Sequence, residues 1–234
     1  MKRRTGTRIR ISGTLVARSA VHVGGIGGDE SADLALATNG QDQLYIPGTS
    51  LAGAMRDWAQ QLVKDGEKSR IIRELWGYQS EKCAPRAGDG RPDDGCASRV
   101  YIDDAVVGLP SGEQVEVRDG VMIDRRTGAA ADGNKYDRAM LPCGTTIPLL
   151  MTVELPSSED ARGFSELVGE VLRALQRKAI RLGAAKTRGL GVVELIDVRT
   201  CEESMVTPSG ILAILRGGDA VPLANMEPYS GERA

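Results

Sequence analysis

The chain has 234 residues, of which 41% are hydrophobic and 26% charged, and its net charge of −2 does not indicate a polyanion partner. This composition is typical of a globular protein, and the length predicts one domain with insertions. No apolar run approaches the roughly 20 residues of a transmembrane helix. The basic first residues lack an apolar signal core behind them. We therefore expect a cytoplasmic protein with no membrane partner.

Three further counts restrict the chemistry. Histidine occurs once, as His22, which argues against histidine-rich metal sites and histidine-paired catalytic triads. Aromatic residues make up only 3% of the chain, which argues against a platform of stacked bases as the main grip on nucleic acid. Of the four cysteines, Cys83 and Cys96 bracket a polar loop. Because zinc needs about four ligands, we interpret them as structural or incidental.

Periodicity predicts helices and strands in alternation. The expected elements, in chain order, are a strand at 7–16, helices at 51–62 and 69–76, a strand at 99–107, a weakly alternating stretch at 114–126, a strand at 147–155, a helix from about 156 to 179, and a closing strand at 192–198. Residues 1–200 are expected to form a single domain with insertions at 78–98 and 115–145. Residues 201–234 are expected to form an irregular tail.

This order of elements predicts the fold class. Strand, helix, strands, helix and strand, joined by right-handed crossovers, give an α+β ferredoxin-like (RRM-like) sheet with helices on one face. The first and last strands would then be central neighbours. That arrangement would bring the Gly183–Gly191 loop near the start of the first helix.

Three segments contain residues suited to chemistry. The turn Pro47–Gly48 leads into Thr49-Ser50, where free helix amides with Arg56 make either an anion site or a simple helix cap. The Gly183–Gly191 loop mixes glycines with cations that suit phosphates, or it is a basic connection. Asp33 follows a glycine run with Asp29 and Glu30, and such acids either bind Mg²⁺ or are solvated.

Together these segments resemble the RAMP superfamily, the repeat-associated proteins of CRISPR systems, and most of all the backbone subunits of type III (Csm and Cmr) effector complexes. The resemblance covers about residues 8 to 198, in family order. The matching segments are His22-Val23-Gly24-Gly25, Asp33, Ile46 to Arg56, Ile123 to Gly128, Pro142 to Thr145, and Gly183 to Gly191.

The resemblance implies a fold, a set of partners and an activity. It implies an RRM-like core with a thumb-like β-hairpin around residues 115–145 that wedges into a guide–target duplex. The implied partners are a crRNA guide, a target RNA, further copies of the chain in a filament, and the large polymerase-like and small subunits of the complex. The implied activity is endoribonuclease cleavage of target RNA at regular intervals, dependent on a divalent metal, Mg²⁺ or Mn²⁺.

The resemblance also implies residue roles. Asp33 matches the catalytic and metal-binding aspartate, where a carboxylate and a metal can help activate a 2′-hydroxyl. The RNA-binding residues it implies are His22, Gly24, Gly25, Thr49, Ser50, Arg56, Arg125, Arg126, Lys186, Arg188 and Gly189.

Two departures from the family pattern keep alternatives open. Ala52 stands where the helix-start motif usually carries a lysine, and Asp29 is a second candidate for the functional acid. His22 is either close to the guide or a hydrogen-bonded structural residue. The alternatives are therefore a non-catalytic structural or filament-capping subunit, or a metal-independent endonuclease that processes guide precursors with His22 as general base. An unrelated ferredoxin-like protein is a fourth interpretation.

Overall fold

The computed structural model describes residues 5–25, 32–62, 67–78, 95–157, 161–216 and 221–222. Its elements are β1 (Thr5–Ala17), β2 (Tyr45–Ile46), α1 (Gly48–Leu62), α2 (Glu67–Trp76), β3 (Val100–Ile102), β4 (Ala105–Val106), β5 (Glu116–Ile123), β6 (Ala130–Met140), β7 (Thr146–Pro156), α3 (Ala161–Gln176), the 3-10 turn η1 (Lys186–Arg188), β8 (Val193–Ser204), α4 (Pro208–Arg216) and β9 (Val221–Pro222). Within these residues, every helix is too short or too polar to cross a membrane.

The main sheet has the ferredoxin-like order. Its strands run β3-β7-β1-β8-β9, and each neighbouring pair is antiparallel. The first and last strands of the expected core, β1 and β8, are neighbours at its centre, as the order of elements predicts. The α+β fold class is confirmed, and β9 adds a short edge strand that the sequence did not indicate.

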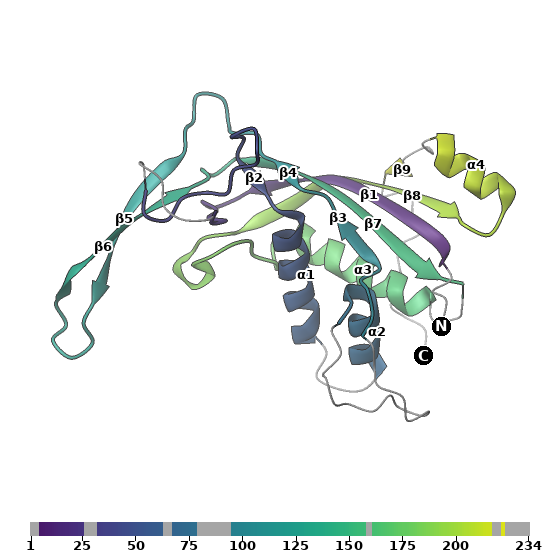
Figure 1. Ribbon diagram of the computed structural model, residues 1–234, viewed down its shortest axis with the longest axis horizontal. Helices are drawn as coiled ribbons and strands as arrows, with labels where there is room; N and C mark the ends of the chain where they lie inside the picture. The colour runs from purple at the N-terminus through teal and green to yellow at the C-terminus, as the bar shows by residue number, and fades with distance from the viewer. Residues whose placement is uncertain are drawn as a thin grey trace.

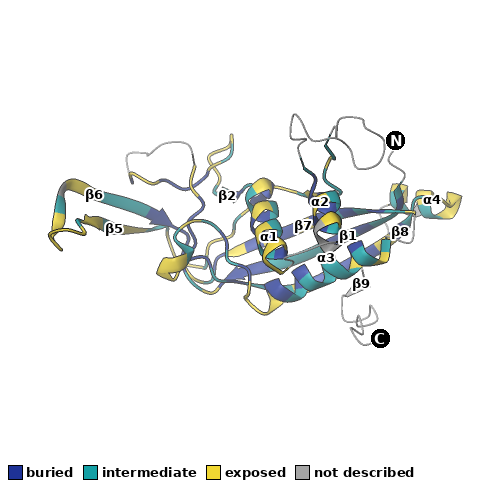
Figure 2. Cartoon of the chain, turned by 90° about the horizontal axis from the view of Figure 1, so that it is seen from below, coloured by how far each residue is buried: buried dark blue, intermediate teal, exposed yellow. Residues whose placement is uncertain are grey.

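Alternation along the strands explains why one face of this sheet is covered. On β7, buried Ile147, Leu149, Met151, Val153 and Leu155 alternate with more exposed residues. Helices α1, α2 and α3 lie on the same face of the sheet, as Figure 1 shows, and they bury these side chains. The core is therefore a single layer between helices and sheet, visible as the dark blue interior in Figure 2.

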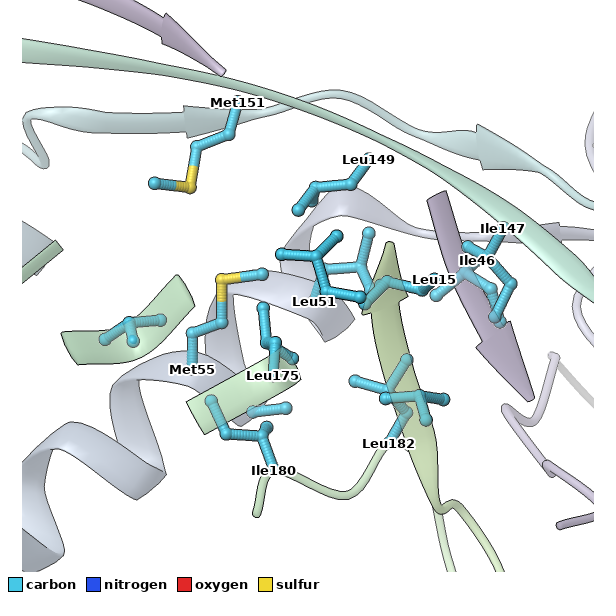
Figure 3. Close-up of a cluster of buried hydrophobic side chains, with 14 of the residues drawn as sticks. Leu15, Ile46, Leu51, Met55, Ile147, Leu149, Met151, Leu175, Ile180 and Leu182 are labelled. Carbon is cyan, nitrogen blue, oxygen red and sulfur yellow. The ribbon is translucent and has the colours of Figure 1, made fainter. Parts of the chain in front are cut away.

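The centre of this core joins the first helix to the strands. Leu51 and Met55 of α1 are fully buried and lie among Leu149, Leu175 and Ile180 (Figure 3). These α1 residues are one turn apart, so they share the apolar face predicted for this helix. Full burial of each such side chain contributes roughly 1.5–3 kcal/mol. The helix start and the sheet are thereby held in a fixed relation.

The excursion around 115–145 is a long antiparallel hairpin of β5 and β6. It projects from the sheet at the end away from α4 (Figure 1). The hairpin expected there from the resemblance is thus present. The polar stretch 127–137 supplies most of β6 and part of the turn, which Asp124 closes by accepting the amide hydrogens of Arg126 and Gly128. Much of the other insertion, 79–94 with Cys83, lies outside the described residues.

Two boundaries differ from the sequence-based expectation. The single strand expected at 99–107 is divided into β3 and β4, which belong to different sheets. The tail expected to be irregular from residue 201 is ordered at first, since β8 runs to Ser204 and α4 packs against it. The structure explains this helix locally: Pro208 suits the first helical position, and the Thr207 hydroxyl accepts the amide hydrogen of Gly210.

Candidate nucleic-acid interface

His22 is held inside the protein. Its ring is 4% exposed, and Nδ1 lies 2.7 Å from the carbonyl oxygen of Ala139 in β6, to which it donates. Its own carbonyl accepts the amide hydrogen of Ala184 at 2.9 Å. The histidine thus connects the hairpin to the Gly183–Gly191 loop. The structure therefore matches the hydrogen-bonded structural alternative for His22, and a contact with RNA stays a prediction.

Gly24 and Gly25 form the exposed edge beside that histidine. Gly24 pairs with Leu36, and the amide of Gly25 donates to the Ala35 carbonyl at 3.1 Å. A Cβ on Gly25 would lie 2.8 Å from the carbonyl oxygen of Leu36, so only glycine allows this close approach. Their exposed backbone is open to a ligand. Asp29 and Glu30, which follow, lie outside the described residues.

Asp33 lies exposed at the base of the hairpin. Its Oδ2 accepts the amide hydrogen of Asp137 at 3.0 Å, while the amide of Leu34 donates to the Asp137 carbonyl at the same distance. These two bonds dock the Asp33 segment along β6. One oxygen of the expected catalytic carboxylate therefore positions the hairpin, and the other has no protein partner within the described residues.

Asp33, Asp119, Asp137 and Lys135 lie close together on this side of the hairpin, and their interactions shift the pKa of three of them. The pKa of Asp137 is raised, first by its side-chain hydrogen bond with Asp119 and then by desolvation and by the charges of Asp119 and Asp33. The pKa of Asp119 is lowered by hydrogen bonds with Lys135 and Asp137, and that of Lys135 is raised by Asp119. A cation brought to Asp33 and Asp137 would relieve their mutual repulsion.

The residues around Asp33 can contribute only part of a metal site. Across the described ranges, no group of three or more histidine, cysteine or acidic side chains is arranged to hold an ion. Mg²⁺, however, commonly binds through one or two carboxylates and takes its other ligands from water and substrate phosphates. Asp33, beside Asp137, fits that sparse donor set, and it fits a metal that arrives with RNA better than a preformed metal centre.

The start of α1 already has an anionic partner. The amide of Gly48 donates to Oδ1 of Asp104 at 2.7 Å, so a carboxylate from the β3–β4 connection caps the helix. The first turn carries Thr49, which is exposed, and Ser50, which is half-buried. Arg56 is half-buried one and a half turns on, without a salt bridge to any described residue. The capping function expected of Thr49 or Ser50 is therefore performed by Asp104.

Hydrogen bonds hold the Gly183–Gly191 loop in place and connect it to the hairpin. Arg181 donates from one guanidinium nitrogen to the carbonyls of Lys186 and Leu190, at 3.1 and 3.3 Å. Gly189 has φ of +88° and open space where a Cβ would be, so the backbone there is accessible. Exposed Arg188 donates to the hydroxyl of Tyr136 at 2.8 Å.

The hairpin tip carries the last predicted pair. Arg125 and Arg126 are both exposed in the turn between β5 and β6. The apolar side chains nearby are exposed as well: Val121, Met122 and Ile123. An apolar, cationic tip of this kind is suited to entering between stacked bases and to contacting phosphates.

The structure brings together some predicted residues and separates others. Asp33, the His22–Gly25 segment and Arg188 all adjoin the base of the hairpin. The α1 start is instead bonded to the β3–β4 connection, whereas the Gly183–Gly191 loop forms hydrogen bonds with Ala20, His22 and the hairpin. Sequence reasoning missed Tyr136, Asp137 and Arg138. The alternation of side chains along 135–140 could have indicated a strand there, but most residues of this stretch are polar, so no apolar face was visible.

A ferredoxin-like core, a protruding hairpin and a basic glycine-rich loop at its base define an RNA-binding class of protein. The RAMP superfamily model matches residues 14–194, more than half of the chain, and the chain belongs to this superfamily. It is thus a CRISPR-associated RNA-binding protein. A search of curated proteins finds no match.

Proposed function

We propose that the chain is a guide-RNA-binding backbone subunit of a type III CRISPR effector complex that cuts complementary target RNA at regular intervals. The observation that carries the proposal is the attachment of Asp33 to the base of the β5–β6 hairpin through Asp137. A hairpin that wedges into a duplex along its length would bring distorted RNA to this carboxylate at its base. The basic loop bonded to the other side of the hairpin would hold the guide backbone.

In this proposal each residue has a defined task. The amide of Asp137 fixes Asp33, whose second oxygen faces the attacking 2′-hydroxyl and accepts its proton or orients it. Gly24, Gly25 and Gly189 offer backbone to RNA. Arg125, Arg126 and Lys186 neutralise phosphates, with Thr49, Ser50 and Arg56 as a separate contact on α1.

A divalent metal, Mg²⁺ or Mn²⁺, would be held by Asp33 and RNA phosphate, and would supply stabilisation of the charge that develops at the cleaved phosphate. Asp137 is the adjacent carboxylate that would share this cation. The assignment predicts that cleavage is lost with a chelator and is restored by adding the ion back.

A structural, non-catalytic subunit is the second candidate. It is favoured by the use of Asp33 Oδ2 as a hydrogen-bond acceptor inside the protein, since the same bond would serve a purely structural residue. The two candidates share guide, target RNA, further copies of the chain, and the large and small subunits as partners. They differ only in whether Asp33 acts on RNA.

The test is cleavage by guide-loaded complexes carrying Asp33→Asn or, as the matched control, Asp29→Asn, each with and without Mg²⁺. Asparagine keeps the size of the side chain and an acceptor for the Asp137 amide while removing the charge. We expect Asp33→Asn to bind RNA but to cut at least about a hundredfold more slowly, and Asp29→Asn to cut normally. Equal cutting by Asp33→Asn would refute the role of Asp33, and loss only in Asp29→Asn would transfer it to Asp29.

A further inference from the structure

A shallow depression lies between the hairpin and the basic loop. Its lining comes from β5 and β6, among them Arg118, Asp119, Tyr136 and Arg138, and from the loop, among them Arg188. Arg118 is already paired with Glu116 at 2.6 Å, and Asp119 is paired with Lys135 at 3.2 Å. Arg138 and Arg188 are therefore the cations of this depression that form no ion pair with any described acid.

Strand register explains why the arginines gather there. Arg118 pairs with Arg138 and Gly120 pairs with Tyr136 across the hairpin, whereas Asp119 pairs with Asp137. Because alternate residues of a strand point to opposite faces, Tyr136 and Arg138 lie on one face and Asp119 and Asp137 lie on the other. The first face also holds Arg118 with its ion-pair partner Glu116, and the second holds Lys135 with its partner Asp119. We call the first one the cationic face, because its two arginines outnumber its one acid.

Tyr136 fixes the geometry of the cationic face. A Cβ on Gly120 would lie 2.4 Å from the Tyr136 ring, so the ring rests where glycine leaves room for it. In that position its hydroxyl accepts the hydrogen bond from Arg188 at 2.8 Å. The bond leaves the other guanidinium N–H groups of Arg188 available to a ligand and holds the loop against the hairpin.

Arg138 has donor capacity that the protein does not use. Its guanidinium carbon is 5.9 Å from the centroid of the Tyr136 ring, and its Nη1 is buried without a hydrogen-bond partner among the described residues. A buried guanidinium nitrogen without an acceptor is costly, so such a group indicates an acceptor supplied from outside. A phosphate oxygen, which guanidinium groups bind in bidentate fashion, fits this position.

We propose that Arg138 and Arg188 bind one phosphodiester of single-stranded RNA in this depression, with Tyr136 as the positioning residue that aims Arg188. The proposal rests on the proposed RNA-binding function and adds a contact on the hairpin face opposite to the Asp137 side chain. The hairpin would then hold the RNA backbone on its cationic face, while Asp33 stays bonded to the Asp137 amide at the edge of β6.

The test is binding of a fluorescein-labelled single-stranded RNA to the full chain, measured by anisotropy over a range of salt concentrations. Arg138→Gln and Arg188→Gln should each weaken binding about tenfold and lower the slope of log K against log salt by about 0.7, the value for one lost phosphate contact on a single strand. Arg138→Lys, which keeps the charge, should retain the slope. Tyr136→Phe should weaken binding with the slope nearly retained, because it releases Arg188 without removing a charge.

The matched control is Arg162→Gln, which removes an exposed arginine paired with Glu166 on α3. An unchanged slope in Arg188→Gln, or an equal change in Arg162→Gln, overturns the proposal. Arg188 is exposed, so its variant decides the matter even if Arg138→Gln fails to fold.

The two proposals can fail separately, and the experiments distinguish the two cases. A complex that binds RNA with the expected slopes but does not cut it contradicts only the role of Asp33. A wild-type chain that does not bind RNA contradicts both proposals.

Discussion

Removing the carboxylate that caps α1 should destabilise the protein measurably. In Asp104→Ala the amide of Gly48 loses its 2.7 Å acceptor at the start of the helix. Loss of a cap costs about 1 kcal/mol, and loss of a negative charge near the positive end of the helix dipole adds about 0.5 kcal/mol for an exposed side chain. The free energy of unfolding should therefore fall by about 1.5 kcal/mol, which is a decrease in Tm of roughly 3–6 °C for a domain of this size.

The assay is thermal unfolding followed by circular dichroism, with Asp103→Ala as the matched control. Asp103 is the adjacent residue and is exposed, and its side chain makes no hydrogen bond or ion pair within the described residues. Its removal should change Tm by less than about 1 °C. Equal Tm decreases in the two variants would show that the lost charge is responsible, and would contradict a capping role for Asp104 at Gly48.

Three further variants test packing and charge. Leu51→Ala, at a fully buried position, should cost about 2–5 kcal/mol in urea unfolding with an unchanged m value; a cost below about 1 kcal/mol would contradict the packing. Arg10→Ala removes the 2.8 Å ion-pair partner of Glu203, whose side chain is 1% exposed, and should lower the free energy of unfolding by on the order of 3 kcal/mol. A smaller decrease in Arg10→Ala than in the surface variant Arg70→Ala would contradict this prediction. The pKa of Asp137 is raised in the folded state, so its stabilising contribution is present below pH 3.8 and is lost as the pH rises through the folded-state pKa. The Tm of Asp137→Asn should therefore increase relative to the Tm of wild type between about pH 4 and 7. A Tm difference that shrinks with rising pH would contradict this prediction.

The sequence predicted those parts of the fold that depend on local periodicity. The alternation of 147–155 and the apolar face containing Leu51 and Met55 became β7 and α1, because each packs one regular face on a single core. Periodicity did not indicate the polar strand β6, since a hairpin that projects into solvent buries little on either face and has no apolar alternation. The hairpin around 115–145 was expected only from the resemblance to the RAMP superfamily. The tail was missed for a similar reason, as α4 is recognised mainly by its cap at Thr207.

The sequence predicted the candidate site only where the residues involved are neighbours along the chain. The glycines and cations of the Gly183–Gly191 loop were visible in the sequence, and in the structure Arg188 and Gly189 are exposed there while Lys186 is half-buried. The burial of His22 depends on Ala139, more than a hundred residues away, and the environment of Asp33 depends on Asp137. Contacts across such separations follow from strand pairing, which no local pattern specifies.

Cleavage by Asp33 is tested by mapping the products of guide-loaded complexes on a complementary end-labelled RNA in Mg²⁺. We expect a ladder of evenly spaced products from wild type, and bound but intact RNA from complexes in which every copy carries Asp33→Ala. Bound and uncut RNA in the wild-type lane, or the same ladder in both, would contradict it.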